Sequence, residues 1–436
     1  MYEYRDITPV DDQDGGEPGG NIRVAFLFRP DRVTFVDRPG GDSTTANSVE
    51  DGTDGVELAF SPGRIDPTNT AFNNSRKPLA GEFIFNGETV FVIVNHFNSK
   101  GGDTPLFGRL QPPVLNSEVQ RLQQAQVVNN FVDNILALDA DANIVVFGDL
   151  NDFPFSPPLA VVEGGVLTNL VTTLPANEQY TYVFDGNSQV LDNFLVSDYL
   201  FSQFDEFDVV HINAEFNAST RRSDHDPSVG TFSIMRTVEI DIRPNSENNR
   251  INLHSHGNVP VAILSTADFD ATTVNPATVT FAGAPVDSRR NDEPRVTFRD
   301  VNEDGLQDIV LRFEIDEMTL TSFDTSATLA GQTFDGYALA GTDAVVVLPL
   351  LRVHGLEEDY PLFTWDETEG AACYQIQIDD QRSFNSPEQD ATVVEATLYN
   401  ADVLPPGRYY RRVRVGGTCV GVPQGEWAEG DRFRVP

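Results

Sequence analysis

The sequence contains very little lysine, cysteine or tryptophan, with two of each among its 436 residues. Lysine and arginine together number 29 against 67 aspartates and glutamates, so the formal net charge is −38. This balance excludes non-specific binding of nucleic acid through a basic surface, because such binding depends on lysine and arginine side chains that neutralise phosphates. Any chemistry on phosphate must therefore depend on a local cluster of side chains or on metal ions.

Long hydrophobic runs are also absent. The longest apolar run, residues 344–351, has eight residues and contains Pro349, whereas a membrane-spanning helix needs about 20. The opening residues MYEYRD include neither the basic nor the apolar region of a signal peptide. We therefore expect no membrane span and no signal peptide in this chain.

The two cysteines, Cys373 and Cys419, both lie near the end of the chain. One pair permits one disulfide, which suits a secreted protein. Two buried thiols that never pair fit the same pattern, so both readings stay open.

The hydrophobic pattern changes twice along the chain, whose length exceeds what one core supports. Residues 1–235 mix strand-type runs with one clear helix and predict an α/β or α+β layered domain. Residues 236–350 contain only strand-type runs between turns and predict an all-β module. Residues 351–436 hold both tryptophans and predict a small β-sandwich.

Two local signals in the first domain are strong. Residues 81–85 and 89–95 flank Asn86-Gly87, which predicts a β-hairpin. Residues 116–139 predict a helix capped by Asn116 or Ser117, with apolar positions at helical spacing (Val119, Leu122, Val127, Phe131, Ile135 and Leu138). Further strands are expected at 21–28, 143–147, 190–196 and 228–234.

Four short segments place polar groups where these predicted strands end: NHFNSK at 95–100, FGDLND at 147–152, VLDNFLV at 190–196 and SDHDP at 223–227. Open α/β sheets place their sites at such ends. Converging histidines and aspartates could bind a divalent metal, orient an imidazole and protonate a leaving oxygen. Each segment alone is more often a turn, but all four in one domain favour a site.

Together with Arg76-Lys77-Pro78-Leu79 and Tyr180-Thr181-Tyr182, these segments resemble the endonuclease/exonuclease/phosphatase superfamily, also called DNase-I-like. The resemblance is greatest to its bacterial extracellular nuclease branch, and it covers residues 21–232. It implies a DNase-I-like β-sandwich with flanking helices. The implied activity is metal-dependent phosphodiester hydrolysis, most simply that of a secreted, non-specific nuclease with DNA or RNA as substrate.

The resemblance also implies a catalytic role for five residues. Asp149 would handle the proton of the attacking water or of the leaving oxygen, and Asn151 would donate to the phosphate. His225 would contact the scissile phosphate while Asp192 holds its tautomer. His96 would be a second phosphate contact.

Substrate-binding residues implied in the same way are Arg76, Asn98, Lys100 and Tyr182. Arg76 would steady the phosphate backbone, as a planar guanidinium does well. Asp224 would help to bind Mg²⁺, or Mn²⁺ or Ca²⁺ in its place, because hard cations prefer oxygen ligands.

The opening of the chain departs from the family pattern. The family fold begins with strands that carry an Asn and then a Glu, the principal metal ligand. Here Met1–Asp6 resembles the stretch after that Glu, and neither Glu3 nor Glu17 lies on an apolar strand that could replace it. We therefore expect a domain that lacks its first strands, binds metal poorly and has impaired activity.

The two later modules carry weaker signals. Residues 300–308 have the spacing D-x-N-x-D-G-x-x-D, which predicts a Ca²⁺ loop with Asp300, Asn302, Asp304 and Asp308 as ligands. A polar hairpin turn is the alternative. Residues 351–436 resemble a fibronectin-type-III or immunoglobulin-like sandwich, in which Cys373 and Cys419 could form the bridge.

Other functions remain open at this stage. The same fold could serve a phosphomonoesterase or a lipid phosphodiesterase. A different class is a non-catalytic, calcium-binding or adhesion-type surface protein. The resemblance places the protein outside the cell or at the cell surface, and the sequence gives no sign of a protein partner.

Overall fold

The computed structural model divides the chain into two compact units, residues 1–235 and 236–436. The structure describes residues 1–12, 14, 21–53, 55–105, 108–244, 246, 249–253, 255–289, 293–321, 323–348, 353–354, 362–365, 368, 371–394, 397–416, 425, 427–429 and 432–435.

The first unit holds all the α-helices of the described chain together with fifteen strands. Its strands are β1 (Glu3–Arg5), β2 (Phe26–Phe28), β3 (Thr34–Val36), β4 (Val49–Gly52), β5 (Gly55–Leu58), β6 (Gly63–Arg64), β7 (Leu79–Phe85), β8 (Glu88–His96), β9 (Asn143–Asp149), β10 (Leu167–Asn169), β11 (Tyr182–Phe184), β12 (Asn187–Gln189), β13 (Asp192–Ser197), β14 (Phe204–Val209) and β15 (Ser228–Phe232). Its helices are α1 (Glu118–Leu138), α2 (Pro157–Glu163) and α3 (Asp198–Phe201), with 3₁₀ turns η1 (Thr70–Phe72) and η2 (Leu170–Thr173).

A seven-stranded mixed sheet forms the centre of this unit. Its order is β10-β13-β9-β8-β7-β3, and β6 pairs with β7. The β8–β9 pair is parallel and the other pairs are antiparallel. The predicted hairpin is β7–β8, and its turn residues Asn86 and Gly87 have φ values of 53° and 81°. These left-handed values are ones that Asn and Gly adopt most easily.

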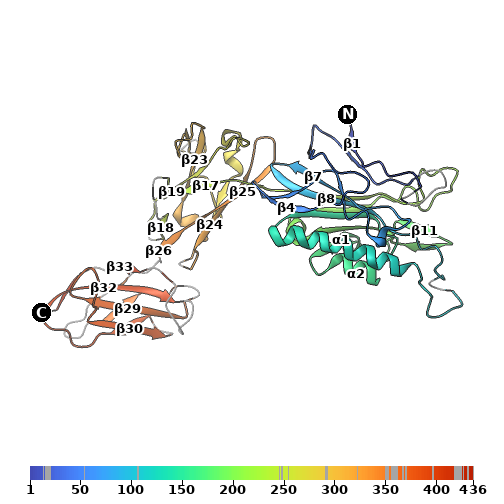
Figure 1. Cartoon of the computed structure of the whole chain (residues 1–436). Helices are drawn as coiled ribbons and strands as arrows, with labels where there is room; N and C mark the ends of the chain where they lie inside the picture. The colour runs from blue at the N-terminus through green and yellow to red at the C-terminus, as the bar shows by residue number, and fades with distance from the viewer. Residues whose placement is uncertain are drawn as a thin grey trace. The chain divides into compact units, whose positions relative to one another are not determined.

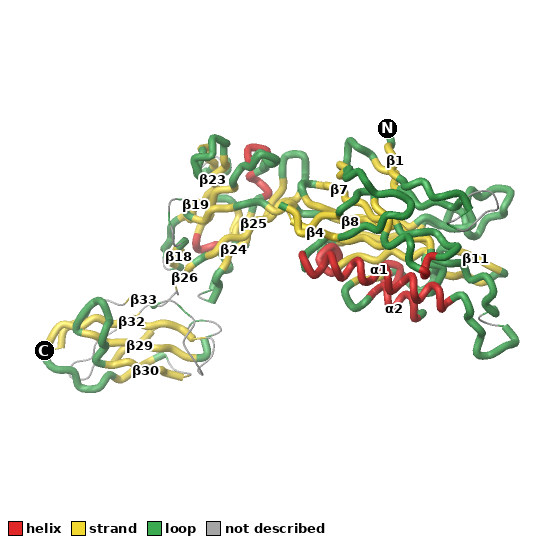
Figure 2. The backbone as a smooth tube through the Cα atoms, viewed as in Figure 1, coloured by secondary structure: helices red, strands yellow, loops and turns green. Residues whose placement is uncertain are grey.

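The two faces of the sheet are covered differently. Helices α1 and α2 lie along one face, as Figures 1 and 2 show, and α1 buries Val128, Val132 and Ile135 against β8 and β9. On the other face, Phe26, Phe28 and Phe35 pack with Phe83 of β7, with ring centroids 4.9–6.0 Å apart. This layered, β-rich arrangement with few helices fits the expected DNase-I-like fold.

Helix α1 begins after Ser117, as predicted, but its buried face differs from the prediction. Val119 is 63% exposed and Leu138 is 48% exposed. The buried face instead includes the polar residues Arg121 and Gln124. A hydrophobic pattern cannot predict these positions, because their burial is stabilised by hydrogen bonds to loops that are distant in sequence.

The second unit contains β16 (Arg236–Thr237), β17 (Ile240–Ile242), β18 (Arg250–Asn252), β19 (Asn258–Ile263), β20 (Thr280–Phe281), β21 (Ala284–Pro285), β22 (Val296–Arg299), β23 (Asp308–Glu314), β24 (Ser326–Gln332), β25 (Ala338–Ala344), β26 (Val346–Leu348), β27 (Val353–His354), β28 (Leu362–Trp365), β29 (Cys373–Asp379), β30 (Gln389–Val394), β31 (Leu398–Asn400), β32 (Gly407–Gly416), β33 (Ala428–Glu429) and β34 (Phe433–Val435). Its 3₁₀ turns are η3 (Ala271–Thr273), η4 (Pro276–Thr278) and η5 (Ile315–Glu317).

Two apolar clusters organise these strands. One joins the sheet β17-β19-β23-β22 to the sheet β16-β25-β24-β20-β21, through residues such as Val261, Leu311 and Leu329. The other lies among β28, β29 and β32 and includes Trp365. Strands β24 and β25 carry little hydrophobic signal in the sequence, because most of their residues are small. The fibronectin-type-III or immunoglobulin-like identity of residues 351–436 stays a prediction.

The candidate calcium loop leads into β23. Asp300, Asn302 and Asp304 accept or exchange hydrogen bonds within the loop, and Gly305 has a φ of 90°. Asp308 is fully buried, and its two oxygens accept from the backbone N–H groups of Ser265 and Val301. In this described loop, the carboxylates of Asp300, Asp304 and Asp308 are not close enough to place one oxygen from each within 4.8 Å of the other two. The calcium assignment stays a prediction.

Cys373 is buried in β29, and Cys419 lies outside the described residues, so the predicted bridge stays a prediction.

None of the helices in the described part combines the length and apolar character that crossing a membrane requires.

Candidate active site

Three adjacent strands of the central sheet place polar side chains in one row. The parallel β8–β9 register pairs His96 with Asp149, and the antiparallel β9–β13 register pairs Asp149 with Asp192. Directly paired residues share one face of a sheet, so the three side chains lie side by side. Accordingly, His96 Nε2 lies 3.3 Å from Asp149 Oδ2.

Gly148 permits this close approach of β8 to β9. Its φ is +126°, and a Cβ at this position would lie 2.1 Å from the carbonyl oxygen of Asn95. Any side chain would therefore push the two strands apart just before Asp149. Gly148 is therefore required by the packing of the two strands, and the Gly-Asp pair is more than a turn signal.

His225 reaches the same row from the loop before β15. Its Nδ1 lies 2.6 Å from Asp192 Oδ2. The Tyr182 ring lies beside the imidazole, with centroids 4.8 Å apart, and an isolated antiparallel bridge joins the two backbones. The structure therefore brings together His96, Asp149, Asp192, His225 and Tyr182 from five separate sequence segments.

The electrostatics of this cluster separate its members by protonation state. Burial, with the added negative charge of Asp192, raises the pKa of Asp149 to about 6. Burial alone would lower the pKa of His225, but the hydrogen bond and charge of Asp192 outweigh it and raise the pKa to about 9. Burial, with the charges of Arg76 and His225, lowers the pKa of His96 to about 4. Near neutral pH the cluster thus holds a cationic His225, a neutral His96 and a carboxylate able to accept a proton.

Asn151 and Arg76 meet at the carbonyl oxygen of Phe97. Arg76 donates to this oxygen over 2.5 Å and Asn151 Nδ2 over 3.2 Å. The same amide nitrogen also donates to Asp149 Oδ2 over 3.1 Å, and the backbone N–H of Asn151 donates to Asp149 Oδ1 over 2.9 Å. Both amide hydrogens are therefore engaged within the protein, and the donation of Asn151 to a phosphate stays a prediction.

A divalent cation fits the carboxylates of this cluster. Oxygens of Asp149 and Asp192 and a ring nitrogen of His225 all lie within 4.8 Å of one another. Because the pKa of His225 is raised to about 9, its imidazole is protonated near neutral pH and is an unsuitable ligand, so the two carboxylates are the candidate protein ligands. Their mutual repulsion, visible in the raised pKa of Asp149, is a cost that a bound cation would relieve.

Three predicted site residues, Asp224, Lys100 and Asn98, lie outside this group of three side chains. Asp224, the predicted magnesium ligand, is not part of that group, although its charge helps to raise the pKa of both His225 and Tyr182. Lys100 is paired with Asp152 at 3.0 Å and lies over the Phe153 ring at 4.4 Å. The backbone N–H of Asn98 donates to Gln124 Oε1 over 2.8 Å, which fixes this loop to α1.

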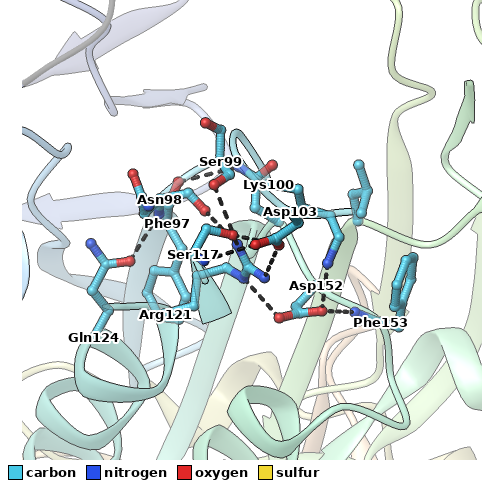
Figure 3. A network of polar contacts seen from close by, with 12 residues as sticks. Phe97, Asn98, Ser99, Lys100, Asp103, Ser117, Arg121, Gln124, Asp152 and Phe153 are labelled. Carbon is cyan, nitrogen blue, oxygen red and sulfur yellow. Dashed lines mark hydrogen bonds and ion pairs between the residues drawn. The ribbon is translucent and has the colours of Figure 1, made fainter. Parts of the chain in front are cut away.

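A buried polar network beneath this loop, shown in Figure 3, was missed by the sequence analysis. Arg121 of α1 is fully buried and donates to Asp152 Oδ2 over 2.7 Å and to Ser117 Oγ over 2.5 Å. It also contacts Asp103 Oδ2 at 3.3 Å and the carbonyl oxygens of residues 98 and 99. The network thus holds the loop after β8 against the segment after β9. The only sequence signal was an arginine on the helix face that also carries Ala125, Val128 and Val132.

Acid should weaken this network through Asp103. Burial alone would raise the pKa of Asp103, but hydrogen bonds from Ser117 and Arg121 outweigh it and lower the pKa. The stabilising effect is therefore present above the unfolded-state pKa of about 4. It is lost as the pH falls through the lower folded-state pKa.

We expect Asp103→Asn to destabilise the chain most near neutral pH, with the difference from wild type shrinking as the pH falls below about 4. Urea unfolding of both proteins across this range measures the difference directly. A difference that stays constant with pH would contradict the assignment.

Comparisons with known proteins place the first unit. Residues 57–224 match the Endonuclease/Exonuclease/phosphatase family. No curated protein sequence matches the chain. Among solved structures, D. rerio TDP2 complexed with single strand DNA product is 16% identical, with 53% of this chain and 77% of that chain covered and a TM-score of 0.35.

Two other solved structures are similar over an equal share of the chain. The Bacteroides thetaiotaomicron mannosyl-6-phosphatase is 16% identical, with 53% of this chain and 77% of that chain covered and a TM-score of 0.29. The human Nocturnin catalytic domain is 16% identical, with 53% and 73% covered and a TM-score of 0.31.

Proposed function

Because the first unit carries a domain of the endonuclease/exonuclease/phosphatase family, we propose that this protein hydrolyses phosphodiester bonds with the help of a divalent cation. The observation that carries the proposal is the row of His96, Asp149 and Asp192 on three adjacent strands, completed by the His225–Asp192 contact of 2.6 Å. The proton acceptor Asp149 and the positively charged His225 therefore belong to one cluster.

In the proposed mechanism, the residues of the cluster transfer a proton and stabilise negative charge. Asp149, which Asn151 and the neutral His96 orient, accepts a proton from the attacking water. As the water oxygen bonds to phosphorus, the P–O bond to the leaving oxygen breaks, and the leaving oxygen takes a proton from solvent. The cationic His225, held by Asp192, offers its remaining N–H to the phosphate oxygens as negative charge builds on them. A bound cation would supply further stabilisation of that charge and would be held by the carboxylates of Asp149 and Asp192.

Exposed aromatic rings beside the cluster support a polynucleotide as substrate. Phe155, four residues after Asn151, is 79% exposed and stacks on Phe153 with centroids 5.3 Å apart. Phe184 is 55% exposed and stacks on Tyr182 with centroids 6.3 Å apart. Nucleobases stack on such rings without regard to sequence. We therefore propose DNA, or RNA in its place, as the substrate of a non-specific nuclease that acts outside the cell.

Removal of metal tests the proposal. The full chain, freed of metal by a chelator, should not cleave single-stranded DNA or a chromogenic phosphodiester. Low activity should return at high concentrations of Mg²⁺ or Mn²⁺, because the cation neutralises two adjacent carboxylates and the charge on the phosphate. Asp149→Asn, prepared in parallel, should stay inactive and thereby excludes a contaminating nuclease.

The outcomes distinguish the remaining alternatives. Cleavage that persists in excess chelator would contradict the role of the cation. Preference for a phosphomonoester would favour the phosphatase reading of the same fold, and release of a phosphorylated headgroup from lipid vesicles would favour a lipid phosphodiesterase. Failure on every substrate with Mg²⁺, Mn²⁺ and Ca²⁺ would favour a non-catalytic binding protein.

A further inference from the structure

The β29–β30 hairpin carries three carboxylates at its loop end. The register pairs Ile378 with Gln389, so one step further along the hairpin Asp379 lies opposite Glu388. One oxygen each from Asp379, Asp380 and Glu388 lies within 4.8 Å of the other two. Like charges placed directly opposite one another destabilise a pair of strands.

Asp379 adds an observation that is independent of this clustering. The residue is 1% exposed. Its Oδ1 accepts from the backbone N–H of Gln381 over 2.7 Å, but its Oδ2 is buried and has no hydrogen-bond partner. A buried carboxylate oxygen that has lost its water without gaining a partner is costly. The unpaired oxygen belongs to the carboxylate that also takes part in the cluster.

No side chain of the described residues compensates these charges. None of the three carboxylates forms a salt bridge with a lysine or arginine there. Glu388 is held in place instead, because its Oε2 accepts from the backbone N–H of Asp380 over 2.9 Å. The nearby Asp390 does not join the cluster, since its two oxygens accept from Gln375 and Gln377. The three carboxylates are therefore pre-arranged but unneutralised.

We propose that Asp379, Asp380 and Glu388 bind a Ca²⁺ ion. Carboxylate oxygens are the ligands that Ca²⁺ prefers, and the group contains no histidine or cysteine that would favour zinc. Asp380 and Glu388 are exposed, which leaves room for the water molecules that complete calcium coordination. The ion would supply a partner for Asp379 Oδ2 and join the two ends of the hairpin loop. This site is separate from the predicted loop at 300–308 and does not depend on the proposed hydrolase function.

Calcium titration by calorimetry of the full, chelator-treated chain tests the site. Glu388→Gln should bind one Ca²⁺ fewer per chain than wild type, because it removes a ligand while leaving an exposed residue of the same size. Glu239→Gln makes the same change at another exposed position and should bind as wild type does. Equal calcium binding by wild type and Glu388→Gln would overturn the proposal.

A second measurement uses Trp365, which is 3% exposed and packs in the same apolar cluster as Ile378 of β29. Addition of CaCl₂ should raise the midpoint of thermal unfolding followed by tryptophan fluorescence in wild type, but not in Asp379→Asn. In chelator alone, Asp379→Asn should unfold at a higher temperature than wild type, because the neutral amide removes the repulsion. A calcium response that is the same in both proteins would also overturn the site.

Discussion

Replacement of His225 by glutamine should lower the rate of phosphodiester hydrolysis by about 10²–10⁴-fold, the usual effect of losing a positioned proton donor or acceptor. Glutamine keeps a donor near the phosphate but cannot carry the positive charge that Asp192 stabilises on the imidazole. The measurement is the initial rate at saturating cation on a chromogenic phosphodiester. The loss should fall on turnover more than on KM, since the charge matters most in the transition state.

His211 provides a matched control for this change. Its Nδ1 lies 3.0 Å from Asp226 Oδ2, so it forms the same kind of histidine–carboxylate pair in the same unit. It is not part of the Asp149–Asp192–His225 group. His211→Gln should therefore retain turnover within a few fold when assayed well below its melting temperature. Equal losses in the two variants would indicate that histidine–carboxylate pairs act here only by maintaining the fold.

Replacement of Arg121 by methionine should lower the free energy of unfolding by about 3–5 kcal/mol, the range found when one partner of a buried ion pair is removed. Methionine has a comparable length, so the loss of volume is small. The change leaves Asp152 without its 2.7 Å partner and Asp103 without its 3.3 Å partner, although Lys100 still pairs with Asp152. The unfavourable term is therefore the desolvation of carboxylates that stay buried.

Urea unfolding followed by the helical circular dichroism signal measures this effect, because every α-helix of the described chain belongs to residues 1–235. Arg109→Met is the control, since Arg109 is exposed and should change stability by no more than about 0.5 kcal/mol. If Arg121→Met unfolded at the same urea concentration as wild type, the network would not stabilise the fold. A double variant, Arg121→Met with Asp103→Asn, should recover part of the loss.

The sequence alone was sufficient for the polar residues at the strand ends. Asn86-Gly87 predicted the β7–β8 hairpin, and the residues before Asp149 predicted β9. His96 and Asp149 lie at the ends of β8 and β9, as the polar residues after these apolar runs indicated. The occurrence of all four segments in one domain, together with the family resemblance, predicted His96, Asp149, Asp192 and His225 as one group.

Only the tertiary structure decided which hydrogen-bond partner each polar side chain takes. Lys100 was expected to bind substrate and Asn151 to donate to a phosphate. Within the fold Lys100 pairs with Asp152 and Asn151 donates to Asp149, and no local pattern contains those pairings. In the same way, Arg121 is buried and Val119 is exposed because α1 meets loops from distant parts of the chain. Residue types and spacing determined which groups gather at the strand ends, since these follow from short-range geometry. The hydrogen-bond partners were decided by the fold, because a buried polar group takes whichever partner packing brings within reach.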